Sequence, residues 1–164
     1  MKRAIYLLTL LITCEIGFSQ NKLQDGIYLI DASSANNNEL TVKDSKTTVQ
    51  YNPFFIEGDP DTYKPLVVST AGFVPLQLSA APVIQRQQGN ESDVLVHLTE
   101  NATQQLKEFT EKNINSEVAV IVDGQAIAVY KLFQPVSGGV LKITKCAGSA
   151  CNQVSRQLKI SARI

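Results

Sequence analysis

The sequence predicts an α+β fold in which one helix packs on a mostly antiparallel sheet. Three observations lead to this prediction. Apolar residues recur at helical spacing between residues 100 and 112. Short runs rich in valine, isoleucine and leucine lie on both sides of that segment. Two of these runs are separated by Asp123-Gly124, which is a strong signal for a β-hairpin.

The N-terminus has the composition of a secretory signal peptide. Lys2 and Arg3 give a positive start, residues 4–13 form an apolar run, and small residues stand at the −3 and −1 positions of a cut after Ser19. The apolar run is shorter than the about 20 residues that a transmembrane helix needs. We therefore expect an exported chain, periplasmic or secreted, that is cleaved near Ser19 and has no transmembrane span.

A lipid anchor is the alternative interpretation of this leader. The segment Leu11-Ile12-Thr13-Cys14 approximates a bacterial lipobox, in which Cys14 would be acylated after cleavage. Thr13 departs from the pattern, because a smaller residue normally precedes the cysteine. The ending Gly17-Phe18-Ser19-Gln20 supplies a competing ordinary cut site and is similar to signal peptides of Bacteroidetes. The ordinary cut is favoured, and the lipoprotein remains the alternative.

The charge of the chain argues against nucleic acid as a partner. The formal net charge is zero, and removal of the leader takes away Lys2, Arg3 and Glu15 and so leaves −1. Binding to phosphates needs clustered cations, and no Lys/Arg cluster interleaves with aromatic residues. Hydrophobic residues make up 44% of the chain and charged residues 18%, which suits a folded core rather than a disordered chain.

The first third of the mature chain is predicted to be a strand-rich N-terminal extension over residues 20–65. Residues 26–30 form an apolar, β-prone run, and residues 40–49 alternate loosely enough to form a polar hairpin. Residues 61–90 contain three prolines. Proline is excluded from helix interiors and from the middle of central strands, so we expect short edge strands and turns in this region.

The strongest local pattern is a strand that leads into a capped helix. Residues 94–98 form the strand, Thr99 is suited to be the helix N-cap, and Glu100 in the first turn favours the helix dipole. The apolar face is carried by Ala102, Leu106 and Phe109, at positions i, i+4 and i+7. The helix should end near Asn113, because asparagine favours turns.

Two further strands are joined by the predicted hairpin. Residues 118–122 are continuously apolar, which is typical of a strand buried on both faces. Asp123-Gly124 suits a type I′ turn, which needs positive φ at both positions, and residues 126–133 form the return strand. After a bend at Gly138-Gly139, residues 140–144 form one more strand. Residues 150–160 fit either a strand or a helix.

Three of these segments form a recognisable pattern. The helix ends in Thr110-Glu111-Lys112-Asn113, residues 118–125 read VAVIVDGQ, and residues 136–144 read VSGGVLKIT. In this order they resemble the head of the first periplasmic domain of the SecD/SecDF translocation proteins, over residues 66–160. The resemblance favours a helix for residues 150–160, because a helix follows the Gly-Gly strand in that family.

The resemblance implies a domain organisation and a function class. Residues 1–19 are the signal peptide, 20–65 the extension, and 66–164 a SecD head-like α+β domain. The implied function is a non-catalytic binding module that contacts unfolded polypeptide or an envelope protein. The alternative is an accessory structural envelope protein with no transport role. The proton-driven motor is not carried over, because the sequence has no membrane spans and no intramembrane carboxylates.

Cys146 and Cys151 are the two cysteines that remain after removal of the leader. An exported chain experiences an oxidising environment, and the residues between these cysteines can form a turn, so we expect a structural disulfide. The spacing is not C-x-x-C, which argues against a redox pair. Zinc is also disfavoured, because His97 is the one other soft ligand in the mature chain and a zinc site needs four.

The remaining chemistry-bearing residues favour no catalytic, cofactor or metal site. His97 is interpreted as a partly buried or edge residue, because no motif supplies the nucleophile and orienting acid that a small hydrolase would need. Glu57, Asp59 and Asp61 alternate in a loop and could bind calcium, but the twelve-residue EF-hand pattern is absent. A solvated loop is the favoured interpretation.

Overall fold

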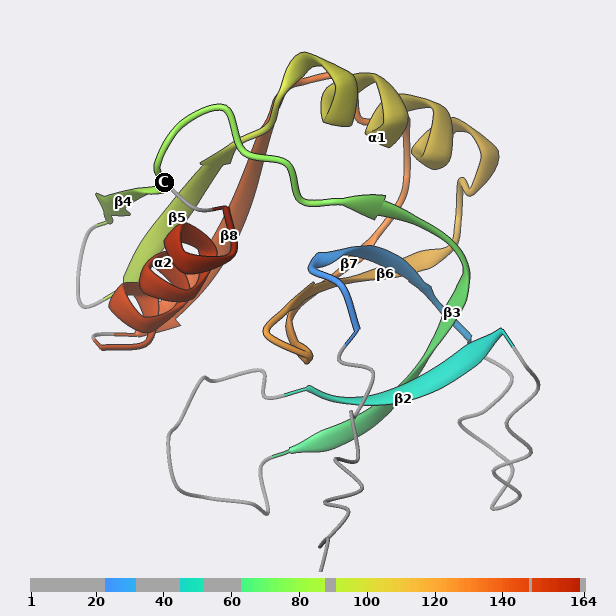
Figure 1. The fold of residues 1–164 in the computed structure, drawn as a ribbon, viewed down its shortest axis with the longest axis horizontal. Coiled ribbons are helices and arrows are strands. Elements are labelled where there is room, and N and C mark those ends of the chain that lie inside the picture. The colour runs from blue at the N-terminus through green and yellow to red at the C-terminus, as the bar shows by residue number, and fades with distance from the viewer. Residues whose placement is uncertain (1–22, 32–44, 52–62, 88–90, 148, 163–164) are drawn as a thin grey trace, which may run out of the picture.

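The computed structural model describes residues 23–31, 45–51, 63–87, 91–147 and 149–162 (Figure 1). The predicted leader, with the cut at Ser19 and the alternative anchor at Cys14, lies outside the described residues. The acidic loop that contains Glu57, Asp59 and Asp61 lies outside them as well.

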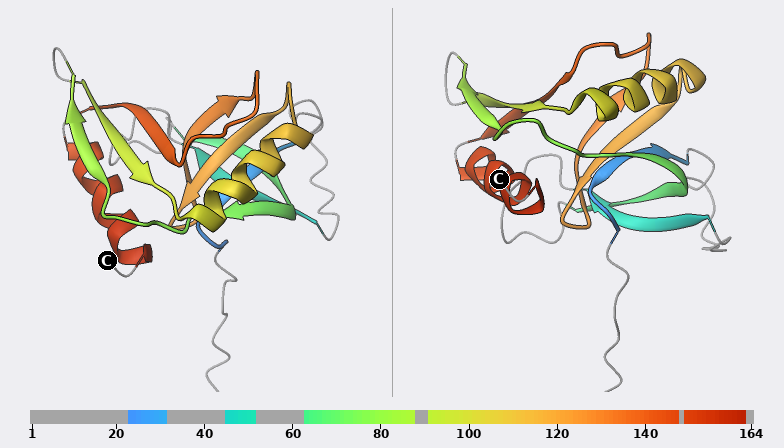
Figure 2. Two further views of the ribbon diagram at one scale, coloured as in Figure 1. Left: turned by 90° about the horizontal axis from the view of Figure 1, so that it is seen from above. Right: turned by 45° about the horizontal axis from the view of Figure 1, so that its top comes forward.

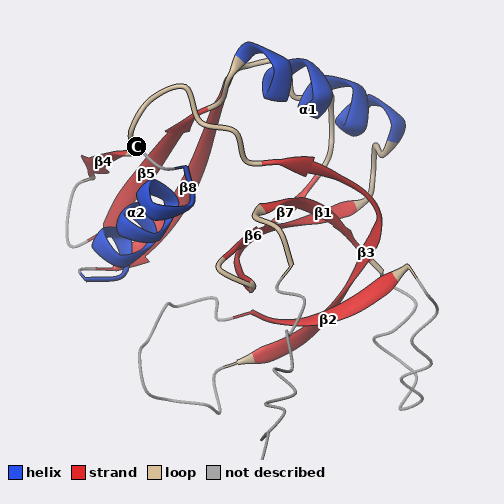
Figure 3. Cartoon of the chain, viewed as in Figure 1, coloured by secondary structure: helices blue, strands red, loops and turns tan. Residues whose placement is uncertain are grey.

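The described residues form eight strands and two helices (Figure 3). In chain order they are β1 (Gly26–Ile30), β2 (Lys46–Tyr51), β3 (Lys64–Pro75), β4 (Val83–Arg86), β5 (Glu91–His97), α1 (Glu100–Lys112), β6 (Glu117–Val122), β7 (Gln125–Lys131), β8 (Val140–Ala147) and α2 (Ser149–Ala162). The α+β class and the mostly antiparallel pairing are confirmed.

Five strands close into a barrel in the order β1-β3-β2-β7-β6, with β6 again beside β1 (Figure 2). All neighbours are antiparallel except β2 and β7, where a short parallel pair joins Gln50 to Gln125 and Tyr51 to Ala126. Strands β1 and β2 come from the predicted N-terminal extension. They pair with strands from the second half of the chain, so the barrel is built from both parts.

The other three strands form an open sheet in the order β4-β5-β8. Helix α2 lies across one face of this sheet, whereas α1 lies beside the barrel near β3 (Figures 1 and 2). The helical alternative for residues 150–160 is thereby confirmed. Its buried face includes Ala150, Val154 and Leu158 at i, i+4 and i+8, which is helical spacing.

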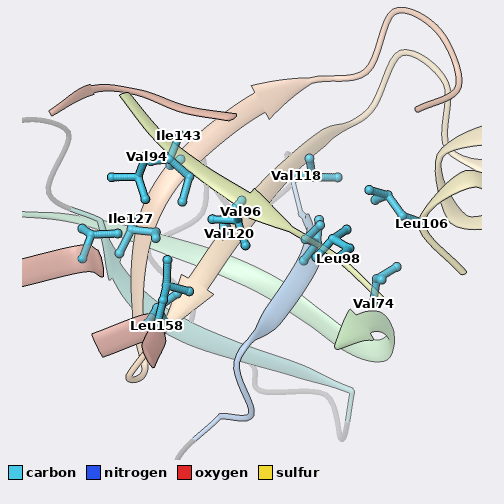
Figure 4. Packing of buried hydrophobic residues seen from close by; sticks show 14 of the residues in the cluster. Val74, Val94, Val96, Leu98, Leu106, Val118, Val120, Ile127, Ile143 and Leu158 are labelled. Carbon is cyan, nitrogen blue, oxygen red and sulfur yellow. The ribbon is translucent and has the colours of Figure 1, made fainter. Parts of the chain in front are cut away.

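Strand β6 separates two hydrophobic cores, as its continuous apolar sequence predicts. Ala119 and Ile121 belong to the core inside the barrel. The larger core lies between the barrel, both helices and the open sheet, and Figure 4 shows its side chains converging. On β6 its members are Val118, Val120 and Val122. All five of these residues are at most 3% exposed, so the strand is buried on both faces.

An aromatic pair fills part of the barrel core. The rings of Tyr28 and Phe73 stack with 4.6 Å between their centroids, and Tyr28 Oη donates a hydrogen bond to the carbonyl oxygen of Gln24 at 2.7 Å. A Cβ on Gly26 would lie 2.7 Å from the Phe73 ring, so glycine is required there. Burial, with the negative charge of Asp25 as the smaller cause, raises the pKa of Tyr28 to about 12.

The prediction of short edge strands over residues 61–90 is wrong for β3. This strand has 12 residues and lies between β1 and β2. Pro65 is its second residue and Pro75 its last, so the missing N–H groups fall at the ends of the strand rather than in its middle. The loosely alternating residues 46–49 belong to β2, which pairs with β3 and β7; residues 40–44 lie outside the described part.

The predicted helix and hairpin agree with the structure at both ends. Thr99 Oγ1 accepts a hydrogen bond from Ala102 N at 3.2 Å, and Asn113 is the C-cap of α1. Asp123 and Gly124 have φ values of 56° and 77°, as a type I′ turn requires. The fully buried residues of α1 are Ala102, Leu106 and Thr110, while Phe109 is partly buried against the larger core.

Candidate binding site

The connection between β7 and β8, residues 132–139, is fastened to helix α1 by a buried hydroxyl. Thr110 is fully buried. Its Oγ1 donates to the carbonyl oxygen of Leu106 at 2.8 Å and accepts from Val136 N at 2.9 Å. Thr110 is the first residue of the Thr-x-x-Asn segment on which the resemblance to the SecD head partly rests. Its role here is to hold the connection at a fixed distance from the helix.

Both ends of the connection are fixed by backbone hydrogen bonds. At its start, Asn115 N donates to Leu132 O at 2.7 Å, and Leu132 N donates to Ser116 O at 2.9 Å. Asn115 has a φ of 67°, a left-handed conformation that asparagine tolerates. At the other end, Leu98 N donates to Gly139 O at 2.8 Å. The connection therefore forms a defined wall beside α1.

A pocket of about 380 Å³ lies between this wall, helix α1 and the barrel. Ile27 of β1 and Val118 of β6 contribute from the barrel, and Leu106 and Thr110 contribute from α1. The remaining lining residues come from β7, the connection and β8: Tyr130, Lys131, Leu132, Phe133, Gln134, Val136, Val140, Leu141 and Lys142. Most of these side chains are apolar, and no aspartate or glutamate is among them.

The pocket has an exposed apolar rim. Phe133 is 76% exposed and Val140 45% exposed, although both line the pocket. Large exposed apolar side chains beside an apolar pocket are a common feature of binding sites. The Nζ atom of Lys131 lies 5.9 Å from the centroid of the Phe133 ring, which is within cation–π range.

The two lysines of the pocket differ in their surroundings. Lys142 Nζ forms a salt bridge of 2.7 Å with Asp93 Oδ2. Asp93 is 4% exposed and also accepts a hydrogen bond from Gln87 Nε2. In the described part of the chain, no ion pair joins Lys131 to a carboxylate. The pocket therefore has one compensated and one uncompensated positive charge.

The predicted disulfide residues lie at the far end of the open sheet, away from the pocket. The backbone of Cys146 is opposite Ser92 in the β5–β8 ladder. Cys151 is 1% exposed, and its Sγ lies 3.5 Å from the carbonyl oxygen of the same Ser92. The two positions therefore converge on one residue. The disulfide itself stays a prediction.

His97 is the last residue of β5 and is half-buried. Its carbonyl oxygen accepts hydrogen bonds from Ser79 N at 2.8 Å and from Ser79 Oγ at 3.3 Å. Among the described residues, no three His, Cys, Asp or Glu side chains gather closely enough to hold a metal ion. Neither of the two helices in the described ranges is long and apolar enough to cross a membrane.

The pocket as a whole was not predicted from the sequence. The family resemblance included Thr110 and residues 136–144 as parts of a sequence pattern. It did not indicate that they lie at a pocket. A signal that could have located the rim is the apolar Leu132-Phe133 pair, which is separated from Pro135 by Gln134 alone. Apolar residues in a connection that cannot continue as a strand suggest a surface with a partner.

The fold and the pocket define a small α+β domain with an apolar pocket between a helix, the barrel and the open sheet. The sequence model described as "SecDF, P1 head subdomain" matches residues 56–162. The match spans more than half of the chain, so the chain belongs to the SecDF P1 head family. This confirms the resemblance identified from the sequence.

Two solved structures are similar to the chain. One is described as "Structure and function of a membrane component SecDF that enhances protein export", with a TM-score of 0.45 and 18% identity over 64% of this chain and 44% of that chain. The other is "Crystal structure of SecDF in Super-membrane-facing form". Its TM-score is 0.49 and its sequence identity is 14%, and the match covers 84% of this chain and 18% of that chain. The chain thus spans less than half of the length of either protein. No curated protein matches it.

Proposed function

We propose that this domain is an exported, non-catalytic module that binds extended segments of unfolded polypeptide in the pocket between α1 and the β7–β8 connection. The observation that carries the proposal is the apolar lining together with the exposed side chains of Phe133 and Val140. Membership of the SecDF P1 head family supports the same class of ligand, because the family resemblance implies contact with emerging polypeptide.

The size of the pocket fits side chains of a flexible chain. A volume of about 380 Å³ is at the lower end of the range for small-molecule sites, and it can hold one or two large apolar side chains. A folded partner would instead require a broad, flat surface. Unfolded segments present such side chains, whereas folded proteins bury them.

The cellular setting follows from the leader. We propose that the chain is cleaved near Ser19 and acts in the periplasm or outside the cell, with a lipoprotein anchored at Cys14 as the alternative. In either setting the chain is exposed to oxidising conditions, so we propose a disulfide between Cys146 and Cys151. The mass of the mature N-terminus distinguishes a free Gln20 from an acylated Cys14.

The binding test uses the mature chain and a permanently unfolded, fluorescently labelled polypeptide. Phe133→Ser should lower the affinity measured by anisotropy by about tenfold to a hundredfold, because one large apolar contact is worth roughly 1.5–3 kcal/mol. Ile160→Ser is the matched control, because Ile160 is 70% exposed on α2 and lies outside the pocket lining. It should leave the affinity unchanged.

Two results would reject the proposal. One is the absence of any binding by the wild-type chain, which would favour an accessory structural envelope protein. The other is an equal loss in the Phe133 and Ile160 variants, which would show that general surface hydrophobicity, and not the pocket, captures the polypeptide.

A further inference from the structure

One wall of the pocket is the edge of strand β8, and the hydrogen-bond pattern reveals how its backbone is oriented. In an antiparallel pair, hydrogen-bonded and non-hydrogen-bonded residue pairs alternate. Leu98 N donates to Gly139 O at 2.8 Å, so this pair is hydrogen-bonded. The register then places His97 opposite Val140 as a non-hydrogen-bonded pair.

The same alternation continues along the strand. Leu141 is opposite Val96 and Ile143 is opposite Val94, and both β8 residues point their N–H and C=O groups toward β5. Val140 and Lys142 therefore point theirs toward the opposite side, away from β5. An independent contact agrees with this orientation: Tyr130 Oη reaches from β7 and donates to the carbonyl oxygen of Lys142 at 2.7 Å.

The outer edge of β8 has no neighbouring strand among the described residues. In the part of the chain that the structure describes, β8 pairs with β5 alone. Val140 and Lys142, whose backbone groups point outward, both line the pocket. The site thus combines an apolar cavity with the outward N–H and C=O of Val140, while the carbonyl oxygen of Lys142 already accepts from Tyr130 Oη.

We propose that the polypeptide binds by strand addition to the outer edge of β8, forming a four-stranded sheet β4-β5-β8-ligand. This inference rests on the proposed function and specifies its geometry. The backbone of the ligand pairs with the N–H and C=O of Val140. Side chains alternate across a strand, so every second ligand side chain enters the pocket on the side of Leu141, and those between face solvent.

The charge of the pocket adds a second preference. Its lining contains Lys131 and Lys142 but no carboxylate, and the charge of Lys142 is compensated by Asp93. The uncompensated charge of Lys131 at the rim favours a ligand with an acidic residue beside its apolar ones. The ligand class is therefore an extended segment that alternates apolar and polar residues and carries a carboxylate near one end.

The first test uses a short fluorescent peptide that alternates valine with serine and ends in glutamate. Two versions carry N-methyl groups, one on the valines and the other on the serines. Only one of these sets has its N–H groups directed at β8, so one version should bind about tenfold more weakly while the other keeps its affinity. Equal effects of the two methylation patterns would overturn strand addition.

The second test changes the protein. Val140→Pro removes a donor that the β5–β8 ladder does not use, so the sheet should persist while peptide affinity falls about fivefold to tenfold. Lys131→Gln should weaken binding of the glutamate peptide about threefold to fivefold and leave a glutamine version unchanged. Lys159→Gln on α2, an exposed lysine away from the pocket, is the control.

The outcomes separate this inference from the proposed function. If no peptide binds to the wild-type chain, both are wrong. If the peptides bind but methylation pattern and Val140→Pro have no effect, the pocket binds side chains without a backbone ladder, and strand addition alone is rejected. The methylated peptides leave the protein unaltered, so a folding defect in a variant does not obscure the result.

Discussion

The barrel and the open sheet differ in whether their strands have unpaired edges. In the barrel, each of the five strands has a neighbour on both sides, and closure leaves no edge. In the sheet β4-β5-β8, the described strands leave two edges, and the edge of β8 borders the apolar pocket. We infer from this difference that the barrel provides stability and that the open sheet provides the surface to which a partner can bind.

The contents of the two regions support this division. The barrel interior is filled by its own side chains, among them the Tyr28–Phe73 stack. The pocket beside the sheet is instead left partly empty and is held in shape by Thr110. A change in the barrel should therefore affect the stability of the whole domain, while a change at the pocket should affect binding first.

The largest effect is expected from the barrel. Tyr28→Ala removes a side chain that is 1% exposed and should lower the free energy of unfolding by about 3–5 kcal/mol, as for other large aromatic residues in cores. Chemical denaturation monitored by circular dichroism measures this loss. A loss below about 1 kcal/mol would contradict the assignment of the barrel as the stabilising region.

The next effect concerns the proposed disulfide, which would connect β8 to α2. Reduction should lower the free energy of unfolding by about 2 kcal/mol, because the bond closes a short loop. Denaturation of the wild-type chain with and without reductant measures the difference. In a variant with serine at both Cys146 and Cys151, the reductant should have no effect. If the mass of the purified mature chain corresponds to two free thiols, the disulfide is excluded.

A smaller loss of stability is expected at the pocket wall. Thr110→Val keeps the shape of the side chain but leaves Val136 N without its acceptor, which should cost about 1–2 kcal/mol and weaken polypeptide binding. Thr103→Val is the matched control on the same helix, because the Thr103 hydroxyl donates to the carbonyl oxygen of the N-cap residue Thr99. Equal binding by both variants would show that the wall does not depend on Thr110.

Tyr28→Phe should change the free energy of unfolding least at neutral pH. The difference in pH dependence between wild type and variant should become visible at high pH. The pKa of Tyr28 is raised from 10.0 to about 12 in the folded chain, so the folded state keeps its proton longer than the unfolded state. Its contribution is fully present below pH 10 and is lost as the pH rises toward 12. Denaturation curves should show a steeper decline over this range for wild type than for the variant.

Local patterns predicted the elements that depend on neighbouring residues. The cap at Thr99 and the turn at Asp123-Gly124 are chemical requirements of a few adjacent positions, and both appear in the structure. The double burial of β6 followed from its uninterrupted apolar sequence. The family pattern was also visible, because it consists of the same local elements in order.

The barrel and the pocket could not be predicted in this way. Barrel closure depends on the parallel pair between Tyr51 and Ala126, which are far apart in the sequence and carry no pairing signal. The prolines of β3 argued against a long strand, and only the register shows that they lie at its ends. The pocket depends on a hydrogen bond between Thr110 and Val136, a contact between a helix and a loop that no periodicity encodes.

The position of β1 in the barrel has a consequence for the order of folding. Its neighbours are β3 and β6, and Gly26 near the N-terminus pairs with Ile121. Such distant contacts slow folding, because a long loop must close before β1 can pair with β6. A chain that emerges N-terminus first can pair β1 with β3 early, but it must leave the opposite edge of β1 unpaired until β6 has followed. During that interval the domain is itself an incompletely folded polypeptide with an unpaired strand edge.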